Sequence, residues 1–234
     1  MLVVSNLTKS YGGEMVLEPL SFQVPRGAIL GLVGPNGAGK TTTLSCLAGL
    51  IRPDGGRATW DGAPIIDQAG LVSLLPESPE VYPLLTVDEH LELTARLFRL
   101  GPGWREDAER LVAAMDLTSH RKKLGAALSK GLRQRVLMAS IALRRARLLL
   151  VDEPMIGLDP AGQREIKRLL AEFRDRGSAI VLSSHQLDLI EELADTVLIL
   201  SKGRVMAQGT LAELKTGAPD ELEDWFFRYT EEGQ

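Results

Sequence analysis

The stretch Gly34-Pro35-Asn36-Gly37-Ala38-Gly39-Lys40-Thr41 decides the fold of this chain. It follows the apolar run 28–33, which predicts a buried strand, and it precedes residues 42–48, which predict the first turns of a helix. Glycine lets the backbone turn sharply and approach a ligand closely, because it has no Cβ atom. Successive backbone N–H groups then form an anion-binding nest at the N-terminus of the helix. A strand, a glycine-rich loop and a helix in this order therefore predict a phosphate-binding P-loop.

Two side chains of this loop have an expected chemical role. Lys40 can reach the β- and γ-phosphates of a nucleotide, and the Thr41 hydroxyl is placed to bind Mg²⁺. The alternative is a glycine-rich turn that ends in Lys-Thr by chance, which the match at eight positions disfavours. The sequence thus gives nine candidate nucleotide-binding residues: Gly34, Pro35, Asn36, Gly37, Ala38, Gly39, Lys40, Thr41 and Thr42.

Composition narrows the class of protein. The chain has 234 residues, of which 44% are hydrophobic and 25% charged, as in an ordinary globular protein of one or two domains. The net charge of −4 does not indicate the excess of basic residues that is typical of nucleic-acid-binding proteins. The single cysteine, Cys46, fits a reducing compartment, and we expect it to be a buried apolar residue. The first residues lack the pattern of a signal peptide, and no apolar run approaches the length of a membrane span, so we expect a cytoplasmic protein.

The order of elements predicts an α/β protein. Expected strands alternate with helices or a helical insertion, which favours a mainly parallel sheet with helices on both faces. The first expected strands, at 2–4 and 16–24, alternate moderately, as in an antiparallel sheet with one wet face. We expect a P-loop core at 1–77 with an antiparallel β subdomain, an α-helical insertion at 78–146, the second part of the core at 147–216 and a C-terminal helix at 217–234. In that last helix, Trp225 and Phe226 are expected to pack back on the body. The expected parallel strands cover 28–33, 71–75, 148–151, 179–182 and 196–200.

Polar groups follow several of these strands at their carboxyl ends, where ligands bind in parallel sheets. Besides the glycine-rich loop, they are Glu77, Asp152, Glu153 and His185. Carboxylates at the end of an apolar strand are costly unless a cation lies near. We expect Asp152 to hold Mg²⁺, directly or through water, and Glu153 to polarise the water that attacks the γ-phosphate. The alternative, a pair of helix-capping acids, is disfavoured by the P-loop upstream.

Taken together, these motifs resemble those of the ATP-binding-cassette (ABC) ATPases over nearly the whole chain. Residues 34–41 match Walker A, and 148–154 match Walker B with its adjacent glutamate. The stretch 157–160 matches the D-loop, and 128–135 matches the signature region that separates this family from other P-loop enzymes. The resemblance implies that His185 is the switch histidine, contacting the γ-phosphate, and that Tyr11 stacks on adenine.

Two positions depart from the commonest family pattern. The signature reads Leu-Ser-Lys-Gly-Leu instead of Leu-Ser-Gly-Gly-Gln. It keeps Ser129 and Gly131, which the resemblance assigns to the γ-phosphate of the opposite subunit. Glu77 stands where the family usually has glutamine, a residue that contacts Mg²⁺ or the attacking water and links the site to the membrane partner. Both departures resemble the exporter-type branch whose membrane subunit is a separate chain.

The resemblance implies an Mg²⁺-dependent ATPase that drives an integral-membrane transporter. ATP would lie between two cassettes, in a homodimer or a heterodimer with a similar chain. The membrane subunit would hold the protein at the inner face of the cell membrane and contact the exposed apolar loop 80–85. One alternative is a soluble ABC ATPase of DNA or translation work, which usually carries a coiled-coil insertion or two fused cassettes. The other is a non-hydrolysing ATP-binding regulatory module, against which Glu153 argues.

Overall fold

The computed structural model describes residues 1–68 and 70–215, and these fall into two compact units. The first unit comprises Met1–Leu74, Arg147–Glu153 and the chain from Leu170 onward. The second comprises Leu75–Ala146 and Pro154–Leu169. The domain boundaries expected from the sequence stay predictions. The helix expected at 217–234, with Trp225 and Phe226, lies outside the described residues.

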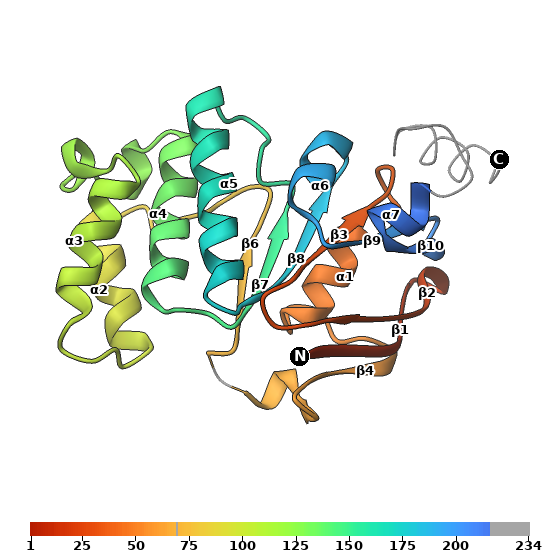
Figure 1. Ribbon diagram of the computed structural model, residues 1–234. Coiled ribbons are helices and arrows are strands. Elements are labelled where there is room, and N and C mark those ends of the chain that lie inside the picture. Colours follow the sequence, from red (N-terminus) through yellow and green to blue (C-terminus); the bar gives the residue numbers. More distant parts are fainter. Residues whose placement is uncertain (69, 216–234) are drawn as a thin grey trace. The chain divides into compact units, whose positions relative to one another are not determined.

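A six-stranded sheet forms the centre of the first unit (Figure 1). Strand β3 pairs in parallel with both β8 and β9, β8 pairs in parallel with β7, and β10 is antiparallel to β9. The mainly parallel sheet predicted from the sequence is therefore confirmed. In sheet order the strands are β10 (Arg204–Thr210), β9 (Thr196–Ser201), β3 (Ile29–Val33), β8 (Ala179–Ser184), β7 (Leu148–Asp152) and β6 (Val72–Leu75).

Helices α1 (Lys40–Leu47) and α6 (Leu187–Leu193) cover opposite faces of this sheet (Figure 1). Side chains of a strand alternate between its two faces. In β3, Leu30 and Leu32 join the buried apolar cluster that also contains residues of α1. Between them, Gly31 faces α6 so closely that a methyl group there would lie 2.7 Å from Ile190. The sequence of β3 thus fixes which helix packs on which face.

A four-stranded antiparallel sheet covers the same apolar cluster. Leu2 and Val4 are buried and Val3 is less so, which is the expected alternation. An irregularity in the ladder between Val4 and Leu7 then shifts the pattern by one residue, so that Asn6 is exposed and Leu7 is buried. The first strand is longer than the expected 2–4, because its ladder with the second strand continues to Tyr11. In sheet order the strands are β2 (Glu14–Val24), β1 (Leu2–Tyr11), β4 (Gly55–Trp60) and β5 (Ala63–Pro64), followed by a 3₁₀ turn, η1 (Ile65–Asp67). Helix α7 (Leu211–Lys215) follows β10.

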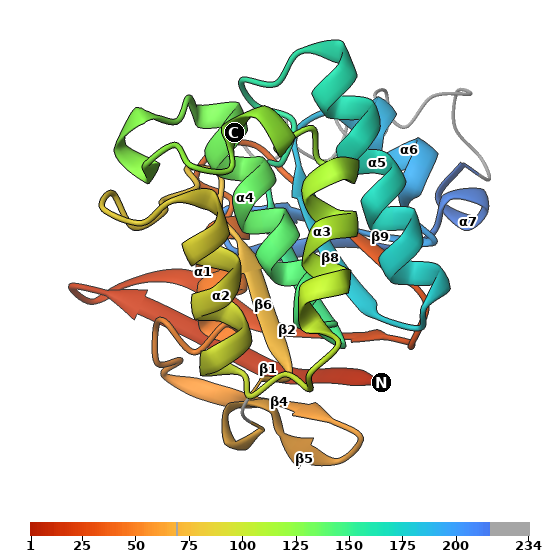
Figure 2. The same cartoon turned by 90° about the vertical axis from the view of Figure 1, so that its left-hand side faces the viewer.

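The second unit is helical. Helix α4 packs against both α2 and α3 (Figure 2). Thr86 and Glu89 form a capping box, since each side chain bonds to the backbone N–H of the other residue. Between residues 78 and 146 there is no strand, apart from one isolated bridge. The elements are α2 (Val87–Leu97), α3 (Trp104–Ala114), η2 (Thr118–His120), η3 (Gly125–Ala127), α4 (Lys130–Leu143) and the first part of α5 (Pro160–Asp175).

Candidate functional site

The glycine-rich loop joins β3 to α1, and its three glycines are required for different reasons. A methyl group on Gly34 would lie under 3.0 Å from the Leu200 carbonyl oxygen, and one on Gly39 would lie 2.5 Å from Leu17 Cδ2. Gly37, with φ of 81°, instead has nothing within 4 Å of such a methyl group. Packing therefore requires glycine at the two ends of the loop, and backbone conformation requires it at the open middle. Helix α1 begins at Lys40 and not at residue 42, because Gly39, at φ of 103°, is its N-cap.

Lys40 is buried and bonded to its own loop. Its Nζ atom donates to the carbonyl oxygens of Gly34 at 2.6 Å and Pro35 at 3.3 Å. The same atom lies 3.7 Å from Glu153 Oε1. An ammonium group can exchange carbonyl acceptors for phosphate oxygens, which carry more charge. Thr41 follows with an exposed side chain at the start of α1.

The two acids at the end of β7 are Asp152, its last residue, and Glu153, which directly follows; both are buried, and each has partners. The Ser183 hydroxyl donates to Asp152 Oδ1. Glu153 has φ of 44°, a left-handed conformation unusual for a residue with a Cβ atom. Its backbone N–H donates to the Ser183 carbonyl oxygen at 3.1 Å, so the turn is anchored to β8. The Ser183 hydroxyl thus offsets part of the cost of burying the Asp152 carboxylate, and the backbone bond fixes the turn at Glu153.

The Glu153 carboxylate lies between two groups that can carry positive charge. Lys40 approaches Oε1, and His185 Nδ1 lies 2.9 Å from Oε2. Ser184 also donates to Oε2, at 3.4 Å. When Nδ1–H of His185 donates to the carboxylate, Nε2 is left to meet a ligand, and the half-exposed ring gives it access to solvent. The structure thus brings together four predicted site residues: Lys40, Asp152, Glu153 and His185.

Tyr11 is exposed at the end of β1, and the residues just before it are held by Asp54. Asp54 accepts from Lys9 Nζ at 2.9 Å and from the Ser10 N–H at 2.6 Å. These bonds, the one with Lys9 foremost, lower the pKa of the Asp54 carboxyl, and the same contact raises the pKa of Lys9. Lys9 Nζ lies 5.2 Å from the centre of the Tyr11 ring. The ring therefore stands on an ordered strand end. Nearby, Cys46 is buried as expected, and burial raises the pKa of its thiol.

The remaining predicted site residues belong to the second unit. Ser129 is the N-cap of α4, where its hydroxyl accepts from the Leu132 N–H. Ser129 and Gly131 line a cavity of about 480 Å³ together with the D-loop stretch 157–159. Glu77 is exposed. Within the second unit, the signature and D-loop residues therefore share one open face, and the roles expected for Ser129, Gly131 and Glu77 stay predictions.

The sequence did not predict the groups that hold the site residues in place. The hydroxyl groups of Ser183 and Ser184 hold the two acids, and the only sequence signal was the serine pair before His185. The glycine-rich loop is also contacted by the Leu200 carbonyl oxygen and Leu17, from other strands, and by Gly203, from the turn between β9 and β10. Nothing local in the sequence marks those contacts, because they depend on the strand order.

A glycine-rich loop between a parallel strand and a helix, with a buried lysine beside an acid pair on a nearby strand, defines a P-loop nucleotide-binding protein. The family described as ABC transporter matches residues 17–156, more than half of the sequence, and the chain belongs to this family. A shorter match, to an AAA domain described as a putative AbiEii toxin of a type IV toxin–antitoxin system, covers residues 125–191.

Individual relatives agree with this assignment. The chain is 37% identical to the SkfA peptide export ATP-binding protein SkfE of Bacillus subtilis (strain 168), over 88% of this chain and 87% of that protein. It is 34% identical to the lipopolysaccharide export system ATP-binding protein LptB of Haemophilus influenzae, over 90% of each. A solved structure described as the ATP binding subunit of an ABC transporter is 31% identical, with a TM-score of 0.92 over 98% of this chain and 99% of that chain.

Membership of this family settles the main activity. The protein is an ABC ATPase whose ATP hydrolysis powers a membrane transporter, as the sequence resemblance implied. ABC ATP-binding subunits of this kind work with membrane subunits. In residues 1–68 and 70–215 of this chain, no helix is long and apolar enough to cross a membrane.

Proposed function

We propose that this chain hydrolyses Mg²⁺-bound ATP at the first unit's site, as half of a dimeric cassette that drives an exporter. The observation that carries the proposal is the Glu153 carboxylate, held between Lys40 and His185 at the end of β7. A buried carboxylate oriented from both sides can accept a hydrogen bond from one water molecule in a fixed direction. In this proposal that water attacks the γ-phosphate, which residues 34–42 hold.

The roles of the other side chains follow from their contacts. Lys40 moves its hydrogen bonds from the loop carbonyls to the β- and γ-phosphates and so offsets negative charge. His185 Nε2 meets the γ-phosphate, while Nδ1 stays bonded to Glu153. Because both side chains contact Glu153, the γ-phosphate and the attacking water are positioned by one connected group. Positioning of this kind supplies most of the rate in phosphoryl transfer.

The donors at the site fit Mg²⁺. The ion usually binds one or two carboxylates together with substrate phosphates and water. Asp152 offers one carboxylate whose second oxygen is not used by Ser183, and Thr41 offers an exposed hydroxyl. Glu77 is the third proposed ligand, from the second unit. In the part of the chain that the structure describes, no cluster of three His, Cys, Asp or Glu side chains forms a metal site, and phosphate-bound Mg²⁺ requires none. Bound Mg²⁺ would offset the charge of the phosphates.

Dimerisation completes the proposed site. Tyr11 stacks on adenine within one chain, and Ser129 and Gly131 meet the γ-phosphate held by the other chain. The open face formed by the signature and D-loop stretches supports this role, because a phosphate can enter a cavity of about 480 Å³. Either a second copy of this chain or a similar cassette can fill the second position.

The membrane partner is proposed from the relatives and from one loop. Several relatives are named for export or drug resistance, among them SkfE, LptB and the daunorubicin/doxorubicin resistance ATP-binding protein DrrA of Streptomyces peucetius. In the loop 80–85, Tyr82 and Leu84 are 60% and 80% exposed, which suits contact with a protein surface. We place the protein at the inner face of the cell membrane, bound through this loop to an export subunit.

Glu153→Gln tests the proposal. Glutamine keeps the shape of the side chain but polarises water less well, so ATP binding should remain while phosphate release stops. Glu106→Gln, an exposed glutamate on α3, is the matched control. With ATP, gel filtration of the Glu153→Gln protein should show about twice the monomer mass. If the Glu153→Gln protein releases phosphate as fast as the unmodified protein, Glu153 has no part in the mechanism. If the unmodified protein binds ATP but releases no phosphate, the chain is a regulatory module and not an ATPase.

A further inference from the structure

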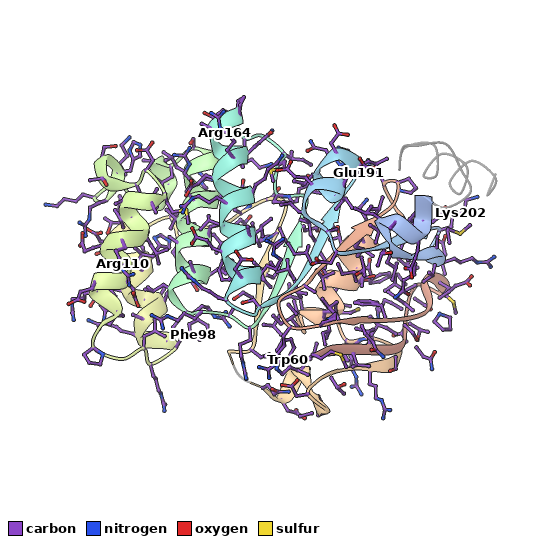
Figure 3. The ribbon with its side chains drawn as sticks, viewed as in Figure 1. Trp60, Phe98, Arg110, Arg164, Glu191 and Lys202 are labelled. Atoms are coloured by element: carbon purple, nitrogen blue, oxygen red, sulfur yellow. The ribbon has the colours of Figure 1, made fainter. Side chains whose placement is uncertain are left out.

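A turn far from the glycine-rich loop in sequence is bonded to it in space. The 202–204 turn lies in the first unit and consists of Lys202 and Gly203, between β9 and β10, and Arg204, the first residue of β10 (Lys202 is labelled in Figure 3). The Gly203 N–H donates to the Ala38 carbonyl oxygen, inside the loop, at 3.1 Å. The Gly203 carbonyl oxygen accepts from the Glu18 N–H, on β2, at 3.0 Å. One residue therefore bridges the phosphate loop and β2 through its backbone.

Two further contacts strengthen the same junction. Arg204 Nε lies 2.6 Å from Glu18 Oε1, so the turn and β2 are also joined by an ion pair. Strand β2 touches the loop directly, because a methyl group on Gly39 would lie 2.5 Å from Leu17 Cδ2. The phosphate loop, β2 and the turn thus meet within a few residues of one another.

Strand β2 matters because it forms a hairpin with β1, and Tyr11 lies at the tip. Tyr11 pairs with Glu14, the first residue of β2, and the paired strands continue to Val24. Glu18 and Leu17 are only a few residues along β2 from that tip. Whatever fixes β2 against the phosphate loop therefore also fixes the distance from Tyr11 to the loop.

The turn fits so closely that only glycine is accommodated. Gly203 has φ of 78°, and a methyl group on it would lie under 3.0 Å from the Val16 carbonyl oxygen. The turn between β4 and β5 has the same backbone shape: Asp61 and Gly62 have φ of 50° and 87°, and Lys202 and Gly203 have 47° and 78°. Nothing lies within 4 Å of a methyl group on Gly62. Turn geometry alone thus explains Gly62, whereas Gly203 is also required by its contact with β2.

We propose that the 202–204 turn is a positioning element of the nucleotide site, which aligns the Tyr11 hairpin with the phosphate loop. This inference rests on the proposed role of Tyr11 in stacking on adenine. A ligand that contacts a protein at two points binds most tightly when the protein already holds those two points at the right separation. A ligand that binds only at the phosphate loop gains no affinity from that alignment. The turn therefore affects the contribution of the base to binding.

ADP and pyrophosphate, each with Mg²⁺, separate these contributions without hydrolysis. The ratio of the dissociation constant of pyrophosphate to that of ADP, measured by calorimetry, reports what adenosine adds. Gly203→Ala should lower this ratio about tenfold, which is part of the roughly five- to 150-fold that a base gains by stacking on an aromatic side chain. Gly62→Ala places the same alanine in the same kind of turn and should leave the ratio unchanged.

Two more variants keep the test decisive. Arg204→Ala removes only an exposed ion pair and should lower the ratio about twofold, so it carries the test if Gly203→Ala does not fold. Tyr11→Ala should lower the ratio as Gly203→Ala does, and combining the two should add little. Equal ratios in Gly203→Ala and Gly62→Ala, or equal losses of ADP and pyrophosphate binding in Gly203→Ala, would overturn the inference. An unchanged ratio in Tyr11→Ala alone would instead overturn the proposed role of Tyr11.

Discussion

Replacing Lys40 by alanine is expected to weaken ATP binding strongly. Lys40 Nζ lies 3.7 Å from Glu153 Oε1, and at an effective dielectric constant of about 20 two unit charges at that separation attract by about 4 kcal/mol. A phosphate oxygen at a similar distance is attracted as strongly, but the two hydrogen bonds to Gly34 and Pro35 must first break. The net contribution of a charge-assisted hydrogen bond is about 1.5–3 kcal/mol, so the dissociation constant of ATP should rise about 10- to 150-fold.

Turnover should fall further than affinity. Charge on the phosphoryl oxygens develops in the transition state, and removing one fixed donor from such a site costs about 100- to 1000-fold. The assay is phosphate release with Mg²⁺-ATP, beside calorimetry for ATP affinity. Lys123→Ala, which removes an exposed lysine from the second unit, is the control. Unchanged affinity and turnover in Lys40→Ala would refute the assignment of the phosphate loop.

Three other outcomes are expected. Glu77→Gln should make ATP affinity depend less on Mg²⁺, because an amide is a weaker ligand than a carboxylate. ATP titrations with and without Mg²⁺ measure this dependence, and an unchanged dependence would leave Glu77 only a role in linking the site to the membrane subunit. Ser183→Ala should lower the free energy of unfolding by about 1–2 kcal/mol in urea titrations, because it removes the donor to buried Asp152. The hydrogen bonds from the Thr86 N–H and hydroxyl lower the pKa of Glu89 in the folded protein. The capping box therefore stabilises the fold fully above the ordinary pKa of 4.5, and this stabilisation is lost as the pH falls through the lowered pKa of the folded state. Unfolding titrations between neutral and acidic pH should therefore show less acid destabilisation in Glu89→Gln than in wild type, and equal acid sensitivity would contradict the linkage.

Much of the candidate site was predictable because its signals are local or follow from parallel strand order. The glycine-rich loop is a continuous motif. Asp152 ends β7, whereas Glu153 and His185 directly follow β7 and β8, and the carboxyl ends of parallel strands meet at one edge of a sheet. The sequence could therefore predict that Glu153 and His185 lie near Lys40, and the structure adds the atoms through which they meet.

The unpredicted parts depend on contacts between distant segments. Strand β1 continues to Tyr11 because β2 pairs with it, although residues 5–10 are too polar to indicate a strand by composition. The left-handed backbone of Glu153 is maintained by its bond to Ser183. Lysine followed by glycine, as at Lys202 and Gly203, is compatible with a tight turn, but the contact of Gly203 with β2 depends on where β9 joins the sheet. Strand order is a global property, and no window of sequence contains it.

The place of β3 in the sheet has a consequence for biosynthesis. Strand β3 leaves the ribosome well before its two neighbours, which are β8, from Ala179–Ser184, and β9, from Thr196–Ser201. Strands β1 and β2, in contrast, can pair as soon as residue 24 is exposed. Until β8 and β9 emerge, the fully apolar β3 therefore has two open edges, a condition that favours mispairing with other chains. The glycine-rich loop that follows β3 is bonded to Gly203, beyond β9, so a ribosome that stalls before β9 leaves the loop without this support and β3 with an unpaired edge.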